Sequence, residues 1–103
     1  RVVGSDANPY LAHAAALASG LYGIKNKLKL GKATVGNGYR DISNGVLPKS
    51  LFDATQNMKA SKIATELFGE TFVKHFTGTR ELECKEFAKS VTDWEHKRYF
   101  EII

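Results

Sequence analysis

Side chains that could do acid–base, metal or nucleophilic chemistry are few and scattered in this chain. The three histidines, His13, His75 and His96, lie far apart, and none has a second histidine or a carboxylate at a convincing ligand spacing on the same helix face. The sequence contains no phosphate-binding Walker loop, no zinc-ligand spacing and no nucleophile elbow. We therefore predict that the histidines are ordinary surface or core residues.

A charged stretch near the C-terminus holds the single cysteine. Glu81, Glu83 and Glu86 are most simply the solvated face of a helix. Cys84 follows Glu83 and precedes Lys85, and nothing nearby would clearly generate a thiolate, so we expect a partly buried structural thiol. A lone cysteine also excludes a disulfide framework within the chain and favours a reducing compartment, which we take to be the cytoplasm.

The first secondary-structure element that would have to position functional side chains is a helix predicted over residues 9–27. Asn8 can cap it, and Pro9 suits its first position because the missing N–H and the fixed φ cost nothing there. Its middle is rich in alanine and carries no Asp, Glu, Lys or Arg before Lys25, while apolar residues recur at three- and four-residue spacings. We expect this helix to be the most buried element of the chain.

A loop follows from Gly31 to Pro48, where glycines and asparagines break any period. A loop of this length should be functional, mobile or packed on a neighbour. Four lysines precede or begin it, at positions 25, 27, 29 and 32, and supply much of the positive net charge. Cations there complement the helix dipole, by about 0.3–1 kcal/mol each. Because aromatic residues are not interleaved with them, we expect no nucleic-acid partner.

Capping residues predict further helices in the C-terminal half. Ser50 and Ser61 each begin a short helix, Gly69 ends the second, a longer helix starts near Glu70, and Thr92 begins a last helix with a capping box. The apolar residues expected on the inner faces are Leu51, Ala54, Met58, Ile63, Leu67, Phe72, Val73, Phe76, Leu82, Phe87 and Val91. The chain is thus predicted to be mainly α, with four or five helices and little or no sheet beyond the tail of a strand at 1–3.

Length and composition agree with one small globular unit of 103 residues with an ordinary apolar fraction. No run is long and apolar enough to span a membrane, so we expect no membrane partner. The first residue is Arg rather than Met, so we expect the start of the chain to be a cleavage point or an artificial boundary.

Several runs share their residues, order and approximate spacing with one protein family. They are the run at 1–27 that contains Ala-Asn-Pro-Tyr-Leu, 37–39 (Asn-Gly-Tyr), 47–51 (Leu-Pro-Lys-Ser-Leu), 68–73 (Phe-Gly-Glu-Thr-Phe-Val) and 91–95 (Val-Thr-Asp-Trp-Glu). In these runs the chain resembles the C-terminal part of the glutamine synthetase catalytic domain over nearly its whole length. The resemblance implies that residues 1–103 are the helical C-terminal segment of a larger α/β catalytic domain.

The resemblance gives Arg1 a role that the sequence pattern alone does not. In that family a strand ends Glu-x-Arg before this helix; the glutamate ligates a divalent metal, and the arginine contacts the substrate glutamate near its γ-carboxyl group. Arg1 aligns with that arginine, and a guanidinium suits the task because its planar fork can hold a carboxylate bidentately. Asn8, Pro9 and Tyr10 would fix the turn that carries Arg1. No catalytic residue and no metal ligand are expected in this chain.

Tyr39 is the only aromatic residue of the long loop. Bacterial members of the family can be adenylylated on a tyrosine in a comparable loop. Here the residues that follow are Arg40, Asp41 and Ile42 rather than the family's Asp-Leu-Pro. We therefore expect Tyr39 to be packed or exposed rather than modified.

The family's function follows as an expectation for the parent protein. It would join glutamate to ammonia or to an amine through a γ-glutamyl phosphate made from ATP with Mg²⁺ or Mn²⁺, as a cytoplasmic homo-oligomer. This fragment should bind no cofactor and be inactive without the rest of the catalytic domain. Two alternatives stay open: a non-enzymatic relative reused as a structural or interaction protein, and a small basic helical binding module.

Overall fold

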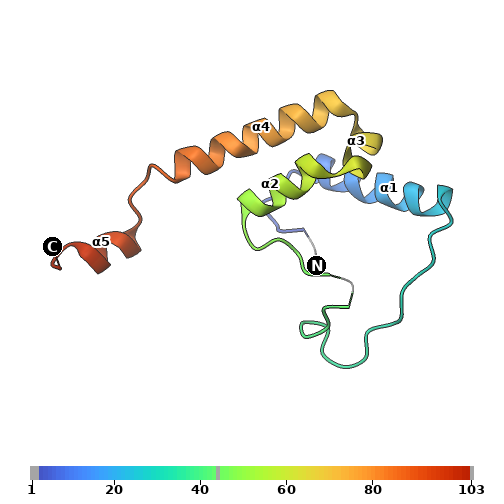
Figure 1. Cartoon of the computed structure of the whole chain (residues 1–103), viewed down its shortest axis with the longest axis horizontal. Helices are drawn as coiled ribbons and strands as arrows, with labels where there is room; N and C mark the ends of the chain where they lie inside the picture. The colour runs from blue at the N-terminus through green and yellow to red at the C-terminus, as the bar shows by residue number, and fades with distance from the viewer. Residues whose placement is uncertain (1–2, 44, 103) are drawn as a thin grey trace. The chain divides into compact units, whose positions relative to one another are not determined.

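The computed structural model describes residues 3–43 and 45–102, and this part of the chain contains five α-helices and no strand (Figure 1). The helices are α1 (Pro9–Lys25), α2 (Leu51–Ala60), α3 (Lys62–Phe68), α4 (Glu70–Phe87) and α5 (Asp93–Tyr99). The prediction of a mainly α chain with four or five helices is confirmed. Within the described ranges, no helix is both long and apolar enough to cross a membrane.

The chain divides into two compact units, Arg1–Val46 and Leu47–Ile103. In the first unit α1 begins as predicted, because the Asn8 side chain accepts hydrogen bonds from the backbone N–H groups of Tyr10 and Leu11. It ends in a Schellman arrangement: Leu28 N donates to Gly23 O over 3.0 Å and Lys27 N donates to Ile24 O over 3.1 Å. Lys27 takes the left-handed φ of 51° that this end requires, so the helix stops two residues before the predicted boundary.

The prediction that the first helix is the most buried element is wrong for this chain. None of its residues is buried, and Leu17, Leu21 and Ile24 are mostly exposed. The physical reason is that the described residues of Arg1–Val46 contain no second helix or strand for α1 to pack against. A helix that is apolar on nearly all sides therefore presents its surface to solvent within this unit.

The second unit has its small core along α4, which packs against both α2 and α3. The described residues buried there are Thr55 (4% exposed), Val73 (5%) and Thr77 (1%). Gly69 separates α3 from α4 with a left-handed φ of 81° and thus ends α3 as predicted. α4 then runs without a break through Gly78.

The predicted inner faces of this unit are confirmed only in part. Val73 is buried, and five further residues are half-buried: Ala54, Met58, Leu67, Phe72 and Phe76. Leu51, Ile63, Leu82, Phe87 and Val91 are exposed. In this unit the helix contacts are those of α4 with α2 and with α3, so only the sides that face one of these neighbours are covered.

Both buried threonines satisfy their hydroxyl groups within their own helices. The Thr77 hydroxyl donates to Val73 O over 2.8 Å, and the Thr55 hydroxyl donates to Leu51 O over 2.6 Å. Each hydroxyl thus bonds the carbonyl four residues earlier, and no partner from another helix is needed. The threonine methyl groups can then pack between helices without leaving a polar group unpaired.

A polar link joins α2 to α4 at the edge of this core. Glu81 Oε1 accepts hydrogen bonds from Lys59 Nζ over 2.7 Å and from Gln56 Nε2 over 3.2 Å. The hydrogen bond from Lys59, followed by that from Gln56, holds the pKa of Glu81 below its ordinary value. The link therefore favours the ionised form of this carboxylate.

The last helix, α5, begins with the predicted capping box. Thr92 N donates to Glu95 Oε2 over 2.8 Å, while Glu95 N donates to Thr92 Oγ1 over 3.3 Å. The backbone hydrogen bond from Thr92 also lowers the pKa of Glu95. The rings of Trp94 and Tyr99 meet edge to face with centroids 6.0 Å apart.

We predict that Thr77→Val changes the free energy of unfolding of this chain by less than about 1 kcal/mol, because Val73 O keeps its helical N–H donor when the hydroxyl is lost. Thr77→Ala should instead cost about 1–2 kcal/mol, since it leaves a small cavity between α4 and its neighbours. Urea unfolding of the two variants beside the wild type measures both changes. Equal destabilisation by Val and Ala would show that the hydroxyl, and not the methyl group, matters at this position.

Glu81 should make stability depend on pH in a defined direction. Because its pKa is lower in the folded state, it stabilises the fold above its ordinary pKa, and this contribution disappears as pH falls through the lowered value. The difference in unfolding free energy between wild type and Glu81→Gln should therefore shrink between about pH 6 and about pH 3. Glu83→Gln is the control, because Glu83 is exposed and no ion pair of the described residues involves it. If the difference between wild type and Glu83→Gln shrank in the same way, the Lys59–Glu81 pair would not be the cause of the pH dependence.

Candidate functional site

The substrate-binding arginine predicted from the sequence, Arg1, lies outside the described residues. The turn that follows it is described. Ala7 N donates to Gly4 O over 3.4 Å, and a Cβ added at Gly4 would lie 2.7 Å from Asp6 Oδ1. Gly4 thus leaves room for the Asp6 side chain to fold back over the turn, which no sequence argument had indicated.

Asn8, Pro9 and Tyr10 form the junction between that turn and α1. Asn8 Oδ1 accepts from Tyr10 N over 3.0 Å and from Leu11 N over 3.3 Å, and Pro9 occupies the first helical turn. The Tyr10 side chain is mostly exposed and contacts no other ring among the described residues. The three residues therefore fix where α1 starts. Their role in positioning Arg1 stays a prediction.

The histidines do not gather into a site. His13 and His75 are exposed, and His96 stacks on Phe100 with ring centroids 4.8 Å apart. The described residues contain no group of three or more His, Cys, Asp or Glu side chains that could hold a metal ion. The prediction of ordinary surface or core histidines is consistent with this arrangement.

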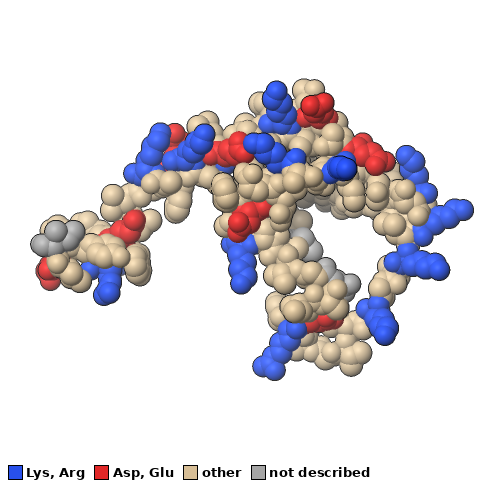
Figure 2. Space-filling view, in the orientation of Figure 1, with Lys and Arg blue, Asp and Glu red and all other residues tan. Residues whose placement is uncertain are grey.

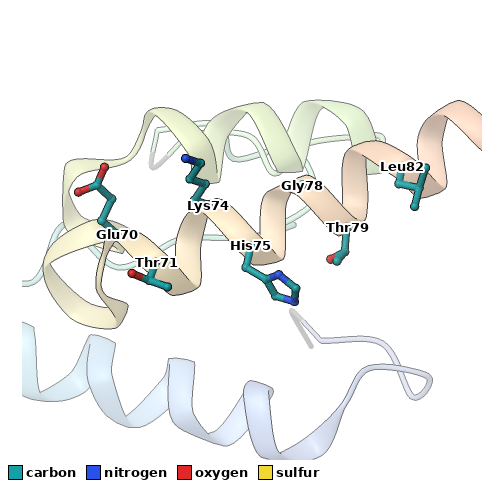
Figure 3. A pocket seen from close by; sticks show the side chains of 7 residues that line it. All are labelled: Glu70, Thr71, Lys74, His75, Gly78, Thr79 and Leu82. Atoms are coloured by element: carbon teal, nitrogen blue, oxygen red, sulfur yellow. The ribbon is translucent and has the colours of Figure 1, made fainter.

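One side of α4 carries a shallow hollow that includes His75 (Figure 3). Its lining residues are Glu70, Thr71, Lys74, His75, Gly78, Thr79 and Leu82, all from this one helix. Figure 3 shows Thr71, His75 and Thr79 pointing to one side of α4, while Glu70 and Lys74 point to another. A ligand would need groups that converge from more than one element, so this surface is no candidate active site.

A second hollow lies between α2 and α4 and contains the cysteine. Its lining includes Phe52, Gln56 and Cys84. Cys84 is a free, half-buried thiol, as predicted, and no histidine lies beside it in this hollow. The groups present match a structural thiol rather than a nucleophile.

The long loop holds a small polar cluster that sequence reasoning missed. Thr34 Oγ1 donates to Asp41 Oδ2 over 2.6 Å, and Ser43 N donates to Asp41 Oδ1 over 2.9 Å. Hydrogen bonds from the Ser43 side chain, from Thr34 and from the Ser43 backbone lower the pKa of Asp41 to about 2. The Asp-x-Ser spacing is a signal for such a turn, whereas the pairing with Thr34 depends on the fold of the loop.

Tyr39 stands on the turn beside this cluster. Asn37 Oδ1 accepts from Tyr39 N over 3.0 Å, and Arg40 N donates to Asn37 O over 3.0 Å. The Tyr39 ring is fully exposed, which is one of the two outcomes predicted for it. No hydrogen bond involves its hydroxyl group within the described part of the chain.

Charge is divided unevenly between the two units. Arg1–Val46 carries six of the 15 Lys and Arg residues and only two of the 11 Asp and Glu residues. Leu47–Ile103 carries nine of each, so the formal net charge of +4 belongs to the first unit. Figure 2 shows Lys and Arg side chains along the loop after α1, whereas both signs are mixed over α2 and α4.

Comparison with known proteins shows which family this arrangement comes from. The glutamine synthetase catalytic domain family matches residues 1–99. A type-1 glutamine synthetase 2 of Dictyostelium discoideum is 49% identical over 107 aligned residues, which cover 100% of this chain and 20% of that protein.

Two further relatives are named for amine substrates. A glutamate–isopropylamine ligase of a Pseudomonas species is 40% identical over 100% of this chain and 23% of its own length. A gamma-glutamylethanolamide synthetase of Streptomyces coelicolor is 38% identical over 98% of this chain and 22% of its own length. The chain spans about a fifth of the length of the relatives it matches, and on the family match over residues 1–99 it belongs to the glutamine synthetase family.

Proposed function

We propose that this chain is the C-terminal helical segment, residues 1–103, of the catalytic domain of an ATP-dependent ligase that joins glutamate to ammonia or to a small amine. The observation that carries the proposal is the family match over residues 1–99, together with relatives named as glutamine synthetases and glutamate–amine ligases. Because the chain spans only about a fifth of those relatives, the activity belongs to a whole protein that contains it.

The proposed reaction has two steps. The γ-carboxylate of glutamate attacks the terminal phosphorus of ATP, which releases ADP and forms a γ-glutamyl phosphate. The amine nitrogen then attacks the γ-carbonyl carbon, a C–N bond forms, inorganic phosphate leaves with the electrons of the C–O bond, and the nitrogen loses a proton. The mixed anhydride makes the carboxylate reactive toward a neutral amine at the expense of ATP.

In this scheme Arg1 binds the substrate at its γ-carboxyl end. A guanidinium fork can hold a carboxylate through two parallel hydrogen bonds and keeps its positive charge at every working pH. The Asn8 cap and the turn at Gly4 support Arg1 because they fix the start of α1 a few residues away. We propose that ATP and Mg²⁺ or Mn²⁺ are held by other parts of the whole protein, because this chain spans only about a fifth of its relatives.

The chain alone is proposed to be inactive and to need the rest of the catalytic domain as its partner. Its α1 helix is apolar on nearly all sides yet has no buried residue, as expected of a helix whose covering surface lies elsewhere in the protein. A homo-oligomeric parent is part of the same proposal. The cytoplasm is the compartment we propose, because one cysteine has no disulfide partner within the chain.

The main alternative is a non-enzymatic member of the same family that uses this fold for structure or interaction. Only Arg1 among the 103 residues corresponds to a family active-site position, so the chain itself does not separate the two cases. Metal-ligand glutamates in the whole protein would favour the ligase, and their replacement would favour the alternative. A whole protein that releases no ADP with glutamate and any amine would also favour it.

If the rest of the catalytic domain covers α1, Ala15→Leu should have different effects in two contexts. In the whole protein the added volume should overpack a close contact and cost about 1–3 kcal/mol of unfolding free energy. In the 103-residue chain the cost should be near zero, because α1 has no buried residue there. Thermal unfolding of both proteins, each beside its wild type, gives the comparison. A variant that melts unchanged in the whole protein would mean that Ala15 does not lie at a tight interface.

In the whole protein Arg1→Lys should impair amide formation although the charge is kept, because a lysine ammonium cannot form the bidentate fork. The expected loss of transition-state stabilisation is about 2–4 kcal/mol. The assay couples ADP release to amide formation with glutamate and either ammonia or a small amine. Arg40→Lys is the matched control, since Arg40 lies in the exposed loop. Wild-type turnover in the Arg1→Lys variant would remove Arg1 from the active site.

A further inference from the structure

The loop between α1 and α2 contains two Asn-Gly dipeptides, Asn37–Gly38 and Asn44–Gly45. In such a dipeptide the asparagine side chain is open to attack by the backbone nitrogen that follows it, because glycine has no Cβ to hinder the approach. The sequence alone gives no reason to separate the two. Asn44 lies outside the described residues, but Gly45, whose nitrogen would attack it, is described.

The two glycine nitrogens differ in their hydrogen bonding. Gly38 is exposed, and no hydrogen bond of the described residues uses its N–H group. A Cβ built on Gly38 would meet only Thr34 Cγ2, at 3.9 Å, so the space beside this nitrogen is open. Gly45 N instead donates to Ile42 O over 3.0 Å. That bond must break before Gly45 N can lose its proton, which raises the cost of its attack.

The Asn37 side chain is held close to the Gly38 peptide. Asn37 Oδ1 accepts from Tyr39 N over 3.0 Å, so the side-chain amide folds over the intervening residue. This arrangement brings Cγ and the attacking nitrogen together before the reaction. The Tyr39 N–H group would also stabilise the negative charge that develops on Oδ1 when Cγ is attacked.

This turn does not depend on a surface from elsewhere in the protein. Its hydrogen bonds, and those of the adjoining Asp41 cluster, all join residues between 34 and 43. The side chains involved are polar, in contrast to the uncovered apolar surface of α1. The geometry at Asn37 is therefore a property of the loop itself.

The other asparagines lack a comparable nucleophile. Asn8 precedes Pro9, which has no N–H group. Asn26 precedes Lys27, whose N–H is already bonded in the turn that ends α1. Asn57 lies within α2, where backbone N–H groups bond the carbonyl four residues earlier.

From these observations we propose that Asn37 is a site of spontaneous deamidation and that it reacts faster than Asn44. Gly38 N loses its proton to hydroxide and forms a bond to Asn37 Cγ. The bond from Cγ to Nδ2 then breaks, and Nδ2 leaves as ammonia after it takes a proton from water. The product is a cyclic imide. Water opens it at either carbonyl, the ring C–N bond breaks, the nitrogen regains a proton, and aspartate or isoaspartate remains.

The modification would change the turn that carries Tyr39. Either product adds a negative charge to Arg1–Val46, which has only two Asp and Glu residues. In isoaspartate the backbone runs through the former side chain, so the carbonyl that now accepts from Arg40 N becomes part of a free carboxylate. This proposal is independent of the ligase activity, because it needs neither Arg1 nor a substrate.

The test is incubation of the 103-residue chain at mildly alkaline pH, followed by trypsin digestion and mass spectrometry. Cleavage after Lys32, Arg40 and Lys49 places the two sites in separate peptides, 33–40 and 41–49, whose masses rise on deamidation. Synthetic peptides of the same two sequences, incubated in parallel, give the ratio of the two rates without the fold. In the chain, the ratio of the Asn37 rate to the Asn44 rate should exceed the peptide ratio by about threefold or more. A ratio equal to or below that of the peptides would overturn the proposal.

Gly38→Ala gives a second measurement. The added methyl group meets only Thr34 Cγ2 at an ordinary contact distance, so the loop should keep its conformation, but the methyl group hinders the nitrogen. Deamidation at Asn37 should slow by about tenfold, while the Asn44 rate stays within about twofold. Gly78→Ala is the matched control, because nothing lies within 4 Å of the Cβ that it adds, and it should change neither rate. An unchanged Asn37 rate in Gly38→Ala would also overturn the proposal.

Discussion

The packing of α4 against α2 and α3 is the interaction on which the rest of Leu47–Ile103 depends. The contact is narrow, and its centre is made of Thr55, Val73 and Thr77. Two of these three side chains carry hydroxyl groups, and burial is acceptable only because each bonds a carbonyl of its own helix. Small β-branched side chains therefore allow the helices to approach closely without an unpaired polar group.

Charged side chains at the edge of the contact between α4 and its neighbours add further interactions, although they are not part of its buried centre. Glu81 receives hydrogen bonds from Lys59 and Gln56 on α2, while the Arg80 guanidinium lies over the Phe76 ring at 5.4 Å from its centroid. Arg80 thus covers the Phe76 ring, and its Nε atom is buried without a hydrogen-bond partner among the described residues. The second unit is thus electrically balanced and largely self-contained, although its core is small.

The first unit, Arg1–Val46, differs from the second in both its packing and its charge balance. Its one helix is apolar and uncovered, its loop is basic and its charges are not balanced within the unit. Such a surface is understandable as part of a larger protein, since a helix of this composition gains stability mainly by burial against other elements. The family match over residues 1–99 gives that larger context.

Helix boundaries that depend on neighbouring residues could be predicted from local sequence patterns. Asn8 with Pro9, Ser50, Ser61, Gly69 and the Thr92–Glu95 box each act within one turn of backbone, and all of these helix boundaries lie where they were predicted. The family could also be identified from the sequence, because the residues around Asn8 are specific and their order is preserved along the chain.

Which side chains are buried, and which distant residues pair, could be known only from the three-dimensional arrangement of the helices and loops. Periodicity marks Leu21 in α1, Ile63 in α3 and Val73 in α4 equally as apolar. Only Val73 is buried, because its side of α4 faces another helix. Likewise, the pairing of Thr34 with Asp41 and of Lys59 with Glu81 joins residues that no local spacing connects. Burial and long-range pairing depend on which surfaces meet in space, and a one-dimensional pattern carries the apolar period but not the identity of the neighbour.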